Sequence, residues 1–106
     1  MNSLQSILSE AHEAIRNIYG SRLSKVLLYG SYARGEQTKE SDIDLLVVLK
    51  GAEFSAGKEI RLINNSLFPL GFKNNLSISA HPVSENKFNT IKSFFLNRVR
   101  AEGKEL

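Results

Sequence analysis

Apolar residues recur with the period of an amphipathic helix in two parts of the chain. Over residues 3–18, Leu, Ile and Ala return every three or four positions and form one apolar stripe. A second stripe of this kind predicts a helix from about residue 56 to residue 68, and we expect Pro69 and Gly71 to end it.

Three other segments have the patterns of β-strands, namely residues 25–29, 43–49 and 74–83. Apart from Asp44, the middle run is continuously apolar, which is typical of a strand covered on both faces over most of its length. In the last run polar and apolar residues alternate, which predicts a strand with one polar face. Ser84 is a candidate N-cap for a final helical region, which we expect to break near residues 89–90.

Strands that alternate with helices predict an α/β (α+β) fold, in which helices pack on a small β-sheet. A length of 106 residues is enough for one domain, residues 1–106, with one modest core. We expect the last helix to stop at Gly103 and the chain to fray after it.

Composition narrows the functional classes. The formal net charge of +3 is dispersed and no dense Lys/Arg run occurs, so nucleic-acid binding is not indicated. The absence of cysteine excludes disulfides and thiolate metal sites. The N-terminal segment has no basic start and carries Glu10, His12 and Glu13 among its apolar residues, so it predicts neither a signal peptide nor a membrane span. We therefore expect a cytoplasmic location.

Two aspartates stand at the start of the most apolar strand. Asp42 and Asp44 are separated by one residue. Side chains alternate between faces along a strand, so both carboxylates should project to one side, close enough to share a cation. Two carboxylates held this close repel each other unless a cation neutralises them. Mg²⁺ fits, because it is a hard ion that takes oxygen ligands and usually also binds substrate phosphates.

A glycine–serine pair supplies the other half of this hypothesis. Gly30 and Ser31 lie where a strand stops and a turn or short helix begins. Glycine lets the backbone approach a phosphate closely, and Ser31 offers a hydroxyl and an N–H. Arg34 could reach the same phosphates or brace the Asp-containing loop. Either motif alone usually marks a turn, but both together, in this order and spacing, favour a phosphate cradle beside a metal site.

The segment GSYARGEQTKESDIDLLVVL, which begins at Gly30, resembles the motif of the DNA polymerase beta-like nucleotidyltransferases, and most closely that of the minimal nucleotidyltransferases (MNT). The family pattern is Gly-Ser, ten residues, then Asp-x-Asp. Here residues 32–41 separate the Gly-Ser pair from the Asp-x-Asp motif of residues 42–44. The expected order of elements suits this fold, so the resemblance covers most of the chain.

The resemblance implies a nucleotidyltransferase fold, a small mixed β-sheet flanked by helices. It implies that Asp42 and Asp44 are catalytic Mg²⁺ ligands and that the phosphates of a nucleoside triphosphate such as ATP bind at Gly30 and Ser31, with Arg34 as a weaker phosphate contact. The implied reaction transfers a nucleoside monophosphate to a hydroxyl, with pyrophosphate leaving. Minimal nucleotidyltransferases resemble antitoxins paired with a helical HEPN protein, so a partner of that type is implied, and it is a candidate acceptor.

Active members of the family also carry a third carboxylate on a later strand that faces the first two. The corresponding strand here is residues 74–83. Its polar face consists of Asn75, Ser77, Ser79 and His81. None of these is a carboxylate, and neither Glu59, on a predicted helix, nor Glu85, after the strand, is a convincing substitute. We expect His81 to be a surface or structural histidine rather than a general base.

Two functions remain open. The chain is either a nucleotidyltransferase, with activity impaired by the missing carboxylate, or a weakly active or non-catalytic module that binds nucleotide or a partner, such as an antitoxin-like partner of a HEPN protein. The sequence identifies neither a base-contacting residue nor the acceptor. A basic, aromatic C-terminal region is either a docking surface or an ordinary amphipathic segment; it contains Lys92, Phe94, Phe95, Arg98 and Arg100.

Overall fold

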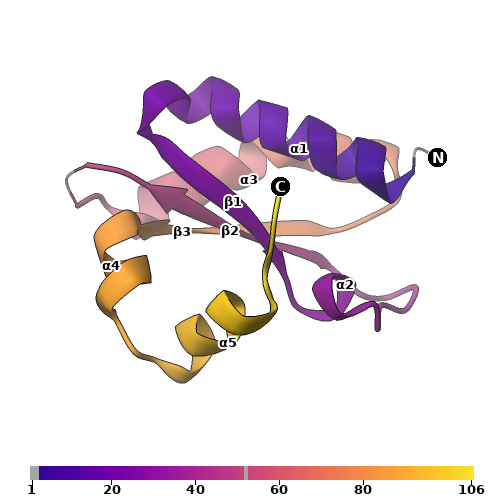
Figure 1. Cartoon of the computed structure of the whole chain (residues 1–106). Helices are drawn as coiled ribbons and strands as arrows, with labels where there is room; N and C mark the ends of the chain where they lie inside the picture. The colour runs from indigo at the N-terminus through magenta and orange to yellow at the C-terminus, as the bar shows by residue number, and fades with distance from the viewer. Residues whose placement is uncertain (1–2, 52) are drawn as a thin grey trace.

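A computed structural model describes residues 3–51 and 53–106 as a mixed α/β domain. Helices and strands alternate along the chain, as the sequence predicts (Figure 1). The elements are α1 (Leu4–Tyr19), the 3-10 turn η1 (Gly20–Arg22), β1 (Leu23–Tyr29), α2 (Ser31–Arg34), β2 (Ile43–Leu49), α3 (Ala56–Lys73), β3 (Ile78–Ser84), α4 (Glu85–Thr90), α5 (Phe94–Glu102) and β4 (Lys104–Glu105).

The four strands form one mixed sheet in the order β3-β2-β1-β4. β1 is antiparallel to both β2 and β4, whereas β2 and β3 are parallel. α1 and α3 cover one face of the sheet, and α4 and α5 cover part of the other (Figure 1). This arrangement confirms the predicted fold class of a small mixed sheet flanked by helices.

β2 is the central strand and separates two apolar cores. Its odd-numbered residues from Ile43 to Leu49 are buried against α1 and α3, and Leu46 and Val48 are buried in a smaller core under α4 and α5. A strand with both faces covered is apolar over most of its length, which explains why residues 43–49 could be predicted with their correct bounds. Asp44 is the one member of this strand that is not fully buried.

The prediction that Pro69 and Gly71 end the second long helix was wrong. α3 continues through both residues to Lys73, because Leu70 and Gly71 are buried against the core and this packing offsets the backbone hydrogen bond that proline cannot make. A Cβ on Gly71 would lie 2.6 Å from the carbonyl oxygen of Leu76, so glycine permits this close approach.

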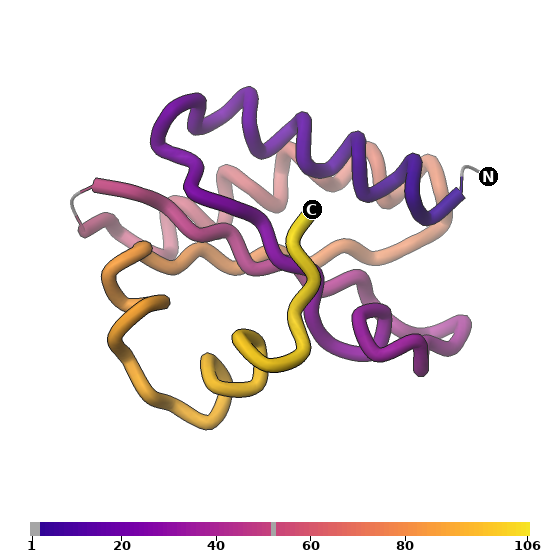
Figure 2. Tube along the Cα trace, in the orientation of Figure 1, coloured from indigo at the N-terminus to yellow at the C-terminus, as the bar shows by residue number. Residues whose placement is uncertain are grey.

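The late strand and the C-terminus also differ from expectation. Residues 74–77 turn the chain out of α3, with Asn75 at a φ of 55°, so β3 begins at Ile78 rather than at residue 74. The expected frayed end after Gly103 was wrong, since Lys104 and Glu105 pair with β1 (Figure 2). The predicted cap at Ser84 and the helix break near residues 89–90 are confirmed.

None of the helices formed by residues 3–51 and 53–106 combines the length and apolarity that a membrane crossing requires.

Candidate active site

The Gly-Ser turn and the Asp pair meet at one end of the sheet. β1 ends at Tyr29, whose register partner on β2 is Asp44, so the residue after β1 lies beside the start of β2. Gly30 has φ 77° and ψ −156°, a conformation that is essentially restricted to glycine. A Cβ at Gly30 would lie 2.5 Å from Asp44 Oδ2, so the backbone of the turn touches the carboxylate directly.

The turn leads at once into α2. The carbonyl oxygen of Gly30 accepts hydrogen bonds from the N–H groups of Ala33 and Arg34, at 3.1 Å and 3.2 Å, so Ser31 is the first residue of this helix. Gly35 ends it with a φ of 72°. The predicted strand, turn and short helix are therefore confirmed.

Neither aspartate is a member of the ion pairs formed among residues 3–51 and 53–106. Partial burial, together with the neighbouring carboxylate of Asp42, raises the pKa of Asp44 above its ordinary value, and His81 opposes this shift. Burial and Asp44 in turn raise the pKa of the Tyr29 hydroxyl to about 12. These effects place Asp42, Tyr29 and His81 within electrostatic reach of Asp44. The carboxylate pair is thus an electronegative site at the end of the sheet.

Ser79 on β3 is the parallel register partner of Asp44, on the same face of the sheet. A third carboxylate from β3 would have to stand beside Asp44, and this position holds a hydroxyl instead. Ser79 Oγ lies 3.5 Å from His81 Nε2. In residues 3–51 and 53–106 no group of three or more His, Cys, Asp or Glu side chains could hold a metal ion.

The two glutamates considered as substitutes are engaged elsewhere. Glu59 accepts a hydrogen bond of 2.7 Å from the Tyr19 hydroxyl. Glu85 accepts one of 2.6 Å from the Ser24 hydroxyl. Both bonds tie helices to neighbouring elements, so neither carboxylate replaces the missing one.

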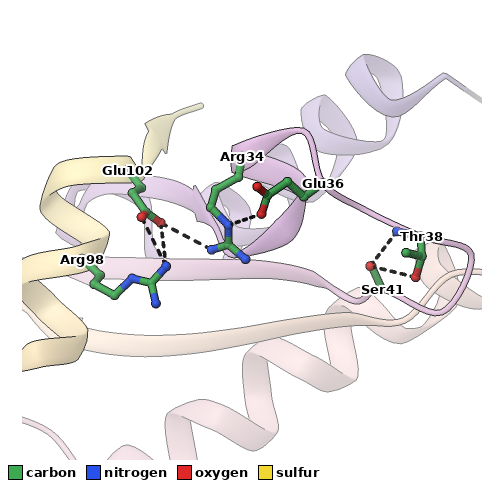
Figure 3. Close-up of polar contacts among 6 residues, drawn as sticks. All are labelled: Arg34, Glu36, Thr38, Ser41, Arg98 and Glu102. Atoms are coloured by element: carbon green, nitrogen blue, oxygen red, sulfur yellow. Dashed lines mark hydrogen bonds and ion pairs between the residues drawn. The ribbon is translucent and has the colours of Figure 1, made fainter.

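Arg34 points toward α5 (Figure 3). Its Nε donates to Glu36 at 2.8 Å, and its Nη1 lies 3.4 Å from a Glu102 oxygen, which also contacts Arg98. The guanidinium therefore contacts both the start of the Asp-containing loop, through Glu36, and the C-terminal helix, through Glu102. The Asp-containing loop is also held by an internal hydrogen bond, since the Thr38 N–H donates to Ser41 Oγ at 2.8 Å (Figure 3).

Sequence reasoning did not identify the surroundings of the Gly-Ser turn. Phe94 and Phe95 of α5 line a hollow with Tyr29 and Gly30. No local pattern could have indicated this, because the contact depends on how α5 packs across the sheet. The aromatic residues themselves were visible as part of the C-terminal region.

The chain matches the nucleotidyltransferase domain family over residues 8–101, and it therefore belongs to that family. A protein of Methanocaldococcus jannaschii, provisionally named a protein adenylyltransferase, is 35% identical over 100 residues, which are 94% of this chain and 95% of that protein. A second protein of that organism with the same provisional name is 46% identical over 44 residues, 42% of this chain and 44% of its own length. The chain is thus a transferase of the nucleotidyltransferase family.

Solved structures share the fold. A provisionally assigned nucleotidyltransferase from Sulfolobus solfataricus has a TM-score of 0.67 at 20% identity, over 94% of this chain and 76% of that one. A chain from the toxin–antitoxin MntA–HpeT has a TM-score of 0.65 at 16% identity, over 92% and 69%. A chain from a toxin–antitoxin with AMP-PNP has a TM-score of 0.64 at 16% identity, over 97% and 72%.

Proposed function

We propose that this protein binds a Mg²⁺–nucleoside triphosphate at the Gly-Ser turn and the Asp pair, and transfers the nucleoside monophosphate to a hydroxyl of a partner protein in the cytoplasm. The observation that carries the proposal is the direct apposition of Gly30 and Asp44, where a Cβ would lie 2.5 Å from the carboxylate. A phosphate that approaches the bare backbone at Gly30 would lie beside the carboxylate pair.

The two aspartates suit a hard divalent cation. Asp42 and Asp44 are the only aspartates in the chain; Asp44 lies on β2, and Asp42 directly precedes this strand and is close enough to influence Asp44 electrostatically. Burial first, and repulsion from Asp42 second, raise the pKa of Asp44, and a bound cation would oppose both effects by stabilising the ionised carboxylate. Mg²⁺ usually binds through one or two carboxylates and completes its coordination with water and substrate phosphates, so this donor set fits it.

Different residues of this chain would bind the metal and the phosphates during the transfer reaction. Asp42 and Asp44 would hold the metal, which when bound neutralises charge on the phosphates. Gly30 and Ser31 would hold the phosphates through backbone N–H groups and the serine hydroxyl. The acceptor oxygen bonds to the α-phosphorus, the bond to the bridging oxygen breaks, and pyrophosphate leaves. The acceptor proton passes to solvent or to a group of the acceptor, because Ser79 is no base at neutral pH.

A protein hydroxyl is the acceptor that the comparisons favour. Relatives carry the provisional name protein adenylyltransferase, and two structural neighbours come from toxin–antitoxin pairs. On this ground we also propose ATP as the nucleotide and a helical toxin-like protein of the HEPN type as the partner. The chain then acts in the role of the antitoxin.

A second candidate is favoured by Ser79. With a hydroxyl at the place beside Asp44, the site can bind a metal–nucleotide complex but has no third carboxylate to activate the acceptor. The protein would then be a nucleotide- and partner-binding module with little or no transfer activity.

Calorimetry with Mg²⁺ and each nucleoside triphosphate, followed by pyrophosphate release in the presence of the partner, separates the candidates. Binding and release that both disappear in Asp42→Asn and Asp44→Asn support transfer, and binding without release supports the module. Glu40→Gln, an exposed neighbour in the same loop, removes a similar charge and should leave binding unchanged. Absence of nucleotide binding in the wild-type protein would refute both.

A further inference from the structure

We propose that α5 supplies the nucleobase subsite, with the base of the bound triphosphate stacked on Phe94 in a hollow between α5 and the Gly-Ser turn. The inference rests on the proposed function and adds to it the part of the substrate that the motifs leave without a contact.

The hollow adjoins the phosphate turn. Its volume is about 210 Å³, and its lining residues are Tyr29, Gly30, Arg34, Phe94, Phe95, Arg98, Val99 and Glu102. Complete small-molecule sites usually measure about 300–1,000 Å³, so this hollow suits one flat ring system rather than a whole nucleotide. Gly30 belongs both to the hollow and to the turn, so a ligand whose phosphates lie at the turn has its remaining part within reach of the hollow.

Aromatic side chains stand exposed at this place. The Phe94 side chain is 79% exposed and that of Phe95 is 45% exposed. Phe95 is fixed by an edge-to-face contact with Tyr29, with ring centroids 5.3 Å apart and an interplanar angle of 84°. Phe94 contacts only the guanidinium of Arg98, 5.8 Å from its ring centroid, among the ring and cation contacts of the described residues. An open phenyl face is a stacking surface for any base, because every base has a π-face.

α5 is held rigidly enough to present these rings. Leu96 and Val99 are buried in the smaller core, and Glu102 joins Arg98 of α5 to Arg34 of α2 (Figure 3). The charged lining residues Arg34, Arg98 and Glu102 are thus paired with one another, and the remaining side chains of the lining are aromatic or aliphatic. A flat ring system would bury this aromatic and aliphatic surface, which a polyphosphate alone would leave exposed.

The other exposed aromatic pair provides a control. Phe68 and Phe72 are 67% and 77% exposed, stack on each other, and lie on α3, which packs on the opposite face of the sheet. The lining of their own hollow includes neither Gly30 nor a residue of α5. Their loss should therefore not affect a base held near Gly30.

The test compares ATP with inorganic tripolyphosphate, both with Mg²⁺, in the wild-type protein, in Phe94→Ala and in Phe72→Ala. We expect Phe94→Ala to weaken ATP binding by about 5- to 150-fold, as for loss of one stacked base, and to leave tripolyphosphate binding unchanged. Phe72→Ala should change neither.

Several outcomes overturn the proposal. Unchanged ATP binding in Phe94→Ala does so, and so does an equal loss for ATP and tripolyphosphate, which would make the role of Phe94 structural. Weakened partner binding with intact ATP binding would assign the hollow to the partner. If the wild-type protein binds ATP no more tightly than tripolyphosphate, the base subsite fails while the phosphate site stands. If it binds neither, the proposed function itself fails.

A second variant tests base stacking by fluorescence and does not require a change in affinity. The chain contains no tryptophan, so Phe94→Trp places a single indole at the proposed stacking position. Saturating ATP should quench its fluorescence, and saturating tripolyphosphate should not. Emission that is the same with either ligand would contradict stacking at this position.

Discussion

Gly30→Ala is the substitution that most sharply separates the site from the fold. The backbone at Gly30 has a φ of 77°, and an added Cβ would lie 2.5 Å from Asp44 Oδ2. An ordinary contact needs about 3.5 Å, so the carboxylate must retreat by about 1 Å. The variant thus moves a proposed metal ligand without changing its chemistry.

The expected cost in stability is moderate. A side chain held in this region of φ/ψ space costs about 1–3 kcal/mol. A domain of this size typically has about 5–15 kcal/mol of unfolding free energy, so the variant should remain folded. The expected effect on function exceeds the effect on folding, because a misplacement of a site residue by about 1 Å can reduce activity by about 100-fold.

Gly35→Ala is the matched control. Gly35 also has a positive φ, of 72°, but no atom lies within 4 Å of the position of an added Cβ. This variant should lose about 1–2 kcal/mol of unfolding free energy and should bind Mg²⁺–ATP as the wild-type protein does. Urea unfolding gives the stabilities, and calorimetry gives the nucleotide affinities.

The comparison can refute the reasoning in two ways. If Gly30→Ala binds Mg²⁺–ATP as well as Gly35→Ala does, the turn and Asp44 do not act as one site. If both variants lose nucleotide binding equally, the loss follows from strain in the turn rather than from displacement of the carboxylate.

Three further variants test other parts of the account. Asp44→Asn should stabilise the ligand-free protein at neutral pH. Because the pKa of Asp44 is raised in the folded state, wild-type stability falls as pH rises from the unfolded-state pKa of about 3.9 through the folded-state pKa. The variant should therefore have the higher melting temperature near pH 7, and the difference should disappear near pH 3. An identical difference at both pH values would contradict this. Ser79→Asp should lower the Mg²⁺ concentration needed for nucleotide binding on the order of tenfold, because Ser79 is the register partner of Asp44. An unchanged Mg²⁺ midpoint would separate Ser79 from the Asp pair. Ser84→Ala should cost about 1 kcal/mol in urea unfolding, since the Ser84 side chain caps α4, and an unchanged midpoint would show that the cap adds nothing.

The sequence predicted the centre of the molecule well because a single physical constraint applies there. A strand covered on both faces is apolar over most of its length, and this fixed residues 43–49. Alternation of side chains then predicted Asp42 and Asp44 on one face, and pairing of the two flanking strands would bring Gly30 to the same edge of the sheet. The first two inferences depend on local geometry alone, and the third is met because β1 and β2 pair in the sheet.

Elements that depend on packing were predicted less well. Pro69 is a strong local stop signal, but burial of Leu70 and Gly71 carries α3 past it. β4 has only two residues and no hydrophobic pattern, so its pairing with β1 left no trace in the sequence. The hollow that Phe94 shares with Gly30 depends on the docking of α5 across the sheet, which periodicity cannot specify.

The conflict at Asp44 links stability to function. An ionised carboxylate that is partly buried and close to another carboxylate lowers the stability of the ligand-free protein. A bound cation and nucleotide would relieve this destabilisation, and the protein would then gain stability from its ligand. A site of this kind is poised to bind, whether or not transfer follows.

The most direct measurement is a crystal structure with Mn²⁺ in place of Mg²⁺ and a non-hydrolysable ATP analogue, with the metal located by anomalous scattering. The account predicts a Mn²⁺ peak between the carboxylates of Asp42 and Asp44 and a triphosphate against the backbone of Gly30 and Ser31. A metal or triphosphate bound elsewhere, or crystals that contain neither at saturating concentration, would contradict it.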